Sequence, residues 1–140
     1  MKKLTILLIL FTTTLEAQIL LREHNGVFCY DGDTCYVEVD GNIRDENGNL
    51  LKIRLLELDT PEISRPKCEE EKQLGLLAKE FLNKLIRDSD SIEFKTDLKK
   101  DPYGRILSHL VIDGVDVSRQ IINNNLGVVY DRNNKKDWCS

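Results

Sequence analysis

The stretch LLKIRLLEL (Leu50–Leu58) has the density of branched apolar residues that is typical of a buried β-strand. Polar residues interrupt the apolar pattern, and the most unusual of them is Arg54, which stands between Ile53 and Leu55. An arginine that leaves a buried strand needs a partner for its charge. The stretch therefore predicts a strand of the core with a charged site beside it.

Other strands are expected on both sides of this one. Runs of β-forming residues bounded by turn residues lie at 27–30 (VFCY), 34–39 (TCYVEV), 91–97 (SIEFKTD) and 106–113 (ILSHLVID). Apolar residues recur at helical spacing between 69 and 88, and DVSRQIINNN (116–125) predicts a second, shorter helix. VVY (128–130) could add a last strand.

The order of these elements restricts the possible fold classes. Five strands, most of them before the first helix, favour a mainly β fold with two to three helices over an α/β layered fold. A small five-stranded β-barrel of OB type fits this order. The chain has 140 residues, which suits one domain, expected at 18–140.

The first residues resemble a targeting segment. Lys3 precedes the apolar run LTILLILF (4–11) and the small residue Ala17 follows it, which together predict a signal peptide at 1–17. The run is too short to span a bilayer. We therefore expect an exported protein, periplasmic or extracellular, that has no membrane attachment after cleavage.

Charge and cysteine usage restrict the function further. The net charge of −4 becomes −5 when Lys2, Lys3 and Glu16 are removed with the signal, which argues against a packaging protein that coats nucleic acid. Four cysteines in an exported chain predict up to two disulfides, with three possible pairings. We favour Cys29 with Cys35 and Cys68 with Cys139, because the second bridge would hold the C-terminal tail.

Two short acidic stretches carry the candidate chemistry. DGDT (31–34) precedes the second strand and LDTPE (58–62) follows the third. Each carboxylate alone is explained by turn chemistry, because Asp and Gly are both turn residues. Taken together, Asp33, Asp59 and the carbonyl of Thr60 are oxygen ligands of the kind that Ca²⁺ prefers, and Glu62 remains as a base.

Two arginines complete the set. Arg54 lies on the strand before Asp59, and Arg105 ends the turn DPYGR (101–105). The planar guanidinium binds a phosphate with two hydrogen bonds and stays charged. Carboxylates for a metal, a base and two guanidiniums are together what phosphodiester hydrolysis requires.

The chain resembles the thermonuclease (staphylococcal-nuclease-like) family. The resemblance lies in DGDT, IRLLELDTPE, the glycine and alanine of LGLLAKEF, DPYGR and DGVDVSRQIINNNLG, and it extends from about Val27 to Tyr130. It implies a five-stranded OB-fold barrel that cleaves DNA and RNA with Ca²⁺ and acts as a monomer. The implied roles are metal binding by Asp33, Asp59 and Thr60, general base catalysis by Glu62, phosphate binding and transition-state stabilisation by Arg54 and Arg105, nucleotide contact by Tyr103, and support of the metal site by Asp31.

Two other function classes stay open. OB-type barrels also bind single strands or protein segments without catalysis, although the 6% aromatic content and the negative charge do not favour such a groove. A structural domain tied by disulfides is supported only by the cysteines. His24 is expected in solvent, His109 in a local pair, and the acidic run CEEEK (68–72) at a solvated helix start.

Overall fold

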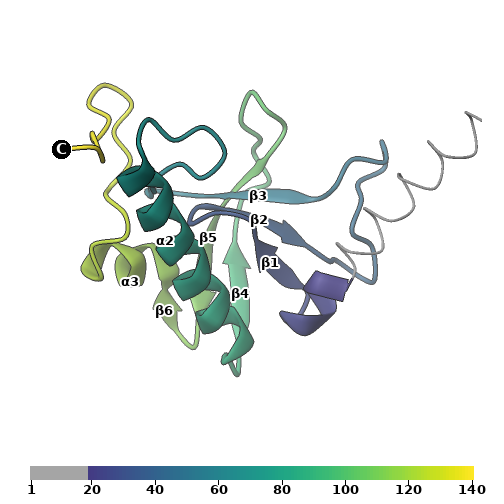
Figure 1. Cartoon of the computed structure of the whole chain (residues 1–140). Helices are drawn as coiled ribbons and strands as arrows, with labels where there is room; N and C mark the ends of the chain where they lie inside the picture. The colour runs from purple at the N-terminus through teal and green to yellow at the C-terminus, as the bar shows by residue number, and fades with distance from the viewer. Residues whose placement is uncertain (1–18) are drawn as a thin grey trace, which may run out of the picture.

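The computed structural model of the chain describes residues 19–140, and its centre is one curled, mixed sheet (Figure 1). The strands follow the spatial order β1 (Val27–Cys29), β2 (Thr34–Val37), β3 (Lys52–Leu55), β5 (Ile106–Ile112) and β4 (Ile92–Lys95), and β6 (Val115–Asp116) pairs with β5. Among the strands that the structure describes, β3 and β5 run parallel to each other and the other pairs are antiparallel. The sheet forms a curled half-barrel, so the predicted α+β fold of OB type is confirmed.

The strands alternate between the core and the opposite face. In β3, Ile53 and Leu55 are buried, whereas Lys52 and Arg54 are only partly buried and point the other way. The strand ends at Leu55, earlier than predicted, because the chain turns at the next two residues and Glu57 has a φ of 59°. The side chain of Arg54 therefore projects from the sheet one residue before the strand ends.

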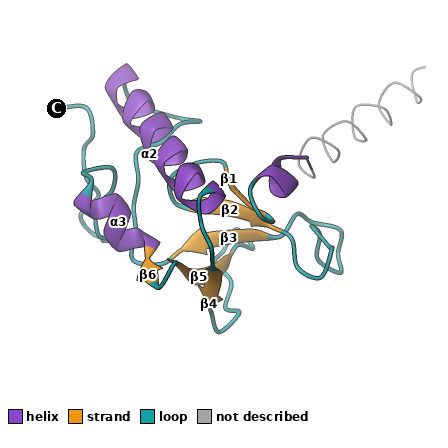
Figure 2. Cartoon of the chain, turned by 90° about the horizontal axis from the view of Figure 1, so that it is seen from below, coloured by secondary structure: helices purple, strands orange, loops and turns teal. Residues whose placement is uncertain are grey.

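Helix α2 (Glu69–Arg87) packs across the sheet, and the shorter α3 (Val117–Asn123) lies beside it (Figure 2). Cys68 caps α2, with its sulfur accepting a hydrogen bond from the N–H of Glu71 at 3.4 Å. The buried face of α2 is formed by residues three or four positions apart, namely Glu71, Gly75, Ala78, Leu82, Asn83 and Ile86. Leu77, which the apolar spacing places on this face, is 57% exposed.

The structure corrects two more sequence predictions. His24 is buried rather than solvated: its Nδ1 lies 2.8 Å from the carbonyl of Leu20 and its Nε2 lies 3.0 Å from Nη1 of Arg87. The expected strand at 128–130 is reduced to an isolated bridge between Asp59 and Val128, followed by one backbone hydrogen bond from the N–H of Tyr130 to the carbonyl of Glu57 at 3.2 Å. His109 does form a local pair, with Asp116 at 3.0 Å.

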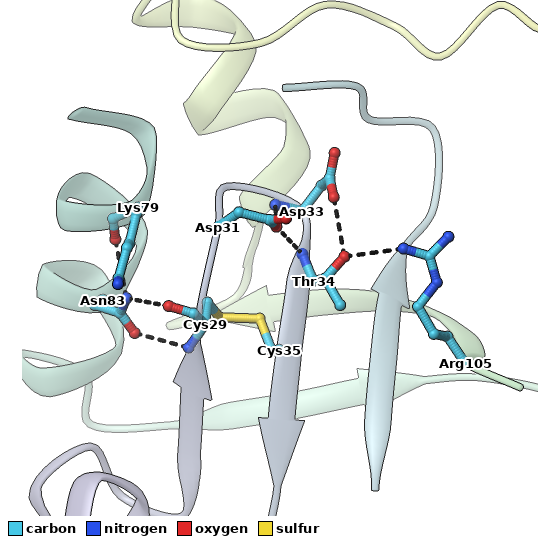
Figure 3. Close-up of a disulfide and its surroundings, with 8 residues drawn as sticks. All are labelled: Cys29, Asp31, Asp33, Thr34, Cys35, Lys79, Asn83 and Arg105. Atoms are coloured by element: carbon cyan, nitrogen blue, oxygen red, sulfur yellow. Dashed lines mark hydrogen bonds between the residues drawn. A yellow bond between two sulfur atoms is a disulfide. The ribbon is translucent and has the colours of Figure 1, made fainter. Parts of the chain in front are cut away.

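Two disulfides join Cys29 with Cys35 and Cys68 with Cys139, which is the favoured pairing. The first connects opposite positions of β1 and β2 (Figure 3). The second holds the C-terminal segment beside the start of α2. Within residues 19–140, no helix is long and apolar enough to cross a bilayer. The predicted signal peptide at 1–17 lies outside the described residues.

Candidate active site

The stretch DGDT forms a tight turn that places Asp33 at the start of β2. One carboxylate oxygen of Asp31 accepts hydrogen bonds from the N–H groups of Asp33 (3.0 Å) and Thr34 (2.8 Å), as Figure 3 shows for Thr34. Asp31 therefore acts as a turn residue, and its side chain fixes the orientation of the next acidic residue. The explanation by turn chemistry therefore holds for Asp31, and the metal-binding role of Asp33 stays a prediction.

The fold brings the second acidic stretch against the first. Thr60 donates both its backbone N–H (3.2 Å) and its hydroxyl (3.0 Å) to Oδ2 of Asp33. The hydroxyl of Thr34 donates to the other oxygen of Asp33 at 3.1 Å. Asp33 and Thr60, 27 positions apart in the sequence, thus share one site at the ends of β2 and β3.

Glycines make this close approach possible. A Cβ at Gly32 would lie 2.7 Å from Cγ2 of Thr60, and a Cβ at Gly127 would lie 3.2 Å from the carbonyl oxygen of Asp59. A side chain at Gly32 would force Thr60 to move, and one at Gly127 would need the backbone of Asp59 to shift slightly. Sequence reasoning explained Gly32 as a turn residue and missed this packing role.

Arg54 lies between the two predicted metal-binding aspartates. Its Nη2 is 3.4 Å from Oδ2 of Asp33 and 4.0 Å from Oδ1 of Asp59. Its Nη1 donates to the carbonyl of Leu55 at 2.7 Å, and the guanidinium faces the ring of Tyr130 at 5.8 Å. The two carboxylates, the carbonyl and the aromatic ring are the partners that the charge of an arginine on a core strand needs.

Arg105 approaches the same site from a neighbouring loop. Its Nη1 donates to the hydroxyl of Thr34 at 3.2 Å (Figure 3), so one threonine connects Arg105 with Asp33. Nε and Nη2 of Arg105 both contact Asp101 at 2.7 Å, which fixes the plane of the guanidinium. The ring of Tyr103 is 84% exposed and faces Arg105 at 5.4 Å. The sequence did not identify Asp101, although a DPYGR turn offers this carboxylate four positions before the arginine.

The carboxyl groups of the site affect one another. Desolvation, and then the charges of Asp33 and Glu71, raise the pKa of Glu62 above its usual range. Desolvation and Asp33 also raise the pKa of Asp59, although Arg54 opposes the shift. Burial, with a further contribution from Asp33, raises the pKa of Asp31 to about 7. Such raised values are typical of carboxylates gathered at functional sites.

The oxygen donors suit a hard cation. Among residues 19–140, no three His, Cys, Asp or Glu side chains gather as a metal cluster. The predicted ligand set is of a different kind, because it combines two carboxylates with the backbone carbonyl of Thr60. Asp33 and Asp59 both contact Arg54, and the charge of Asp33 raises the pKa of Asp59, so the donor set fits a hard divalent cation such as Ca²⁺ chemically.

Comparison with known families agrees with this geometry. The model of staphylococcal nuclease homologues matches residues 52–138, which include Arg54, Asp59, Glu62 and Arg105. The chain belongs to this family. The resemblance recognised in the sequence is thereby confirmed.

Three relatives show how far the similarity extends. The SPbeta prophage-derived endonuclease YokF of Bacillus subtilis is 31% identical over 110 residues, 75% of this chain and 34% of the relative. An uncharacterised protein of Methanocaldococcus jannaschii is 38% identical over 112 residues, 68% of this chain and 49% of the relative. An uncharacterised protein of Bacillus anthracis is 33% identical over 101 residues, 71% of this chain and 43% of the relative. The chain thus spans between a third and a half of the length of these relatives.

Proposed function

We propose that this member of the staphylococcal nuclease homologue family is a Ca²⁺-dependent, sugar-non-specific nuclease that hydrolyses phosphodiester bonds in DNA and RNA. The observation that carries the proposal is the single cluster formed by Asp33, Arg54 and Asp59 at the ends of β2 and β3, with Arg105 connected to it through Thr34. The endonuclease named among the relatives supports the same reaction class.

The roles of the residues follow from their chemistry. Glu62, with its raised pKa, accepts a proton from the water that attacks phosphorus. Arg54 and Arg105 donate hydrogen bonds to the phosphate oxygens, where negative charge increases in the transition state. Asp33, Asp59 and the carbonyl of Thr60 would hold Ca²⁺, which supplies electrostatic stabilisation of the same charge.

The surroundings of the cluster support substrate contact. Tyr103 presents an exposed ring next to Arg105, where a base or sugar of the substrate can pack against it. Arg105 is held by Asp101, so its guanidinium is ordered before a phosphate arrives. Such preorganisation lowers the cost of orienting the donors during the reaction.

We further propose that the protein is exported and acts as a monomer in the periplasm or the medium. The apolar run after Lys3 supports a signal peptide. Two disulfides are also typical of proteins that fold in an oxidising compartment. N-terminal sequencing of protein recovered outside the cytoplasm tests this, because retention of residues 1–17 would contradict cleavage.

The test of activity is hydrolysis of single-stranded DNA by the purified protein, with Ca²⁺ and then with a chelator. Glu62→Gln is expected to lower the rate by ~10²–10⁴-fold while the fold is kept, because general base catalysis is lost. Glu57→Gln is the matched control, since this glutamate lies in the exposed turn after β3. Unchanged turnover by Glu62→Gln removes Glu62 from the mechanism. Binding of the strand without any cleavage by the wild type would favour a non-catalytic OB-fold binding module.

A further inference from the structure

One carboxylate beside the site has no role in the proposed mechanism. Glu71 lies in the first turn of α2 and is 5% exposed, although an acidic residue at a helix start is usually solvated. Its Oε2 accepts a hydrogen bond from the N–H of Lys67 at 2.6 Å, and its Oε1 accepts one from the N–H of Glu62 at 3.3 Å. The two oxygens therefore hold both ends of the segment 62–67.

Helix capping explains only half of this arrangement. The cap position of α2 is filled by Cys68, and an acidic residue three positions later commonly bonds back to the cap itself. The bond from Lys67 is of this type, shifted by one residue. The bond from Glu62 crosses nine positions of sequence, and no helix cap requires it.

The next turn of α2 supports the same peptide group. A Cβ at Gly75 would lie 2.8 Å from the carbonyl oxygen of Pro61 and 3.3 Å from that of Glu62. Gly75 therefore allows the helix to touch the backbone on either side of Glu62. Glu71 binds the N–H of that residue, and the backbone of α2 packs closely against its carbonyl.

We propose that Glu71 is a positioning residue that fixes the backbone of Glu62 and thereby the place of its carboxylate relative to the scissile phosphate. The inference rests on the proposed function, because it requires Glu62 to act as the base. A buried charge with two backbone donors has few other arrangements, so it holds the loop more tightly than a flexible surface contact does.

The test compares Glu71→Ala and Glu71→Gln with the control Glu70→Ala. Glu70 is an exposed glutamate of the same helix turn, so its removal changes the charge equally without touching the loop. We expect Glu71→Ala to lower kcat by ~10²-fold, since a misplacement of about 1 Å has this effect, and to change KM by less than about two-fold. Glu71→Gln should recover part of kcat because its carbonyl keeps one of the two bonds, and Glu70→Ala should equal the wild type.

Amide hydrogen exchange gives a second readout that needs no turnover. The amides of Glu62 and Lys67 should exchange faster in Glu71→Ala than in the wild type or in Glu70→Ala. If Glu71→Ala does not fold, Gly75→Ala displaces the same peptide without a change of charge and should also lower kcat.

The outcomes separate the two proposals. Wild-type kcat in folded Glu71→Ala, or an equal loss in Glu70→Ala, overturns the positioning role and leaves the nuclease proposal intact. A wild type that cleaves no nucleic acid overturns the proposed function, and the positioning role with it. A loss of kcat together with faster exchange at Glu62 supports the inference, whereas a merely structural role would lower the melting temperature and leave kcat of the folded protein unchanged.

Discussion

Replacing Cys68 and Cys139 by serine is expected to lower the free energy of unfolding by about 4 kcal/mol. The magnitude follows from the chain that the bridge closes: the two cysteines are 71 positions apart in sequence, whereas Cys29 and Cys35 are 6 apart. The chain-entropy relation gives about 4.4 kcal/mol for the long loop and about 2.2 kcal/mol for the short one at 25 °C. Serine at position 68 also keeps an oxygen that can cap α2, so the loss reports the covalent link.

The assay is urea unfolding of Cys68→Ser, Cys139→Ser and the double variant, each compared with the wild type. Both single variants break the same link, so each should lose about as much as the double variant. Two outcomes would contradict this: a loss in the double variant equal to the sum of the losses in the single variants, or a loss below about 1 kcal/mol in Cys139→Ser. Either would show that the disulfide does not restrict the unfolded chain as the calculation assumes.

The same variants should affect the site. The C-terminal segment begins at the bridge between Asp59 and Val128, where each residue donates its N–H to the carbonyl of the other at 2.9 Å. It continues past Tyr130, whose ring faces Arg54, and ends at the disulfide. Release of the segment should therefore weaken the support of Arg54 and raise KM for single-stranded DNA.

Three further outcomes are expected. Calcium at 100 times its dissociation constant should stabilise the wild type by about 2.7 kcal/mol and Asp33→Asn much less, as judged from urea midpoints; equal stabilisation of both would exclude Asp33 as a ligand. Gly32→Ala should cost about 1–3 kcal/mol in thermal unfolding, because its Cβ would lie 2.7 Å from Thr60, and wild-type stability would contradict that contact. Asp31 has a pKa raised to about 7, so the metal-free protein should lose stability as the pH rises from about 4 towards 7, and Asp31→Asn should flatten this decline in urea midpoints. An equally steep decline in Asp31→Asn would assign the pH dependence to other groups.

Local patterns in the sequence predicted most of the fold. Alternation of apolar residues located β3 and β5, and helical spacing located α2 to within one residue, because these signals depend on neighbours in the chain. The ends of the strands were predicted less accurately. β3 ends at Leu55, two residues before Glu57 adopts a positive φ, and a glutamate at this position does not predict that conformation. The family resemblance, carried by several motifs in order, brought the acidic and basic residues into one predicted site.

Contacts between distant segments were not predictable in the same way. The sequence predicts a solvated helix start for Glu71, but its carboxylate is buried and accepts the N–H groups of Glu62 and Lys67 from the preceding loop. The solvent exposure expected of His24 was wrong for a similar reason, because its ring contacts Arg87 at the far end of α2. Neither residue type is unusual at its position in the sequence. In both cases the environment of the side chain is set by a residue more than three positions away in the sequence, which local patterns do not reveal.

The charge of the site supplies an argument for a cation that is independent of the family. Desolvation and the charges of neighbouring carboxylates raise the pKa of Asp31, Asp59 and Glu62, and Asp33 contributes to all three shifts. Arg54 contacts two of the aspartates and offsets part of this repulsion, and Lys135 acts in the same direction on Asp59 and Glu62, but the pKa of both carboxyl groups stays raised. A fold that keeps such an excess of negative charge gains most when a divalent ion binds, because the ion replaces repulsion by attraction at every carboxylate near it. The same negative charge repels an anionic phosphate, so we expect a bound cation to favour substrate binding as well as stability.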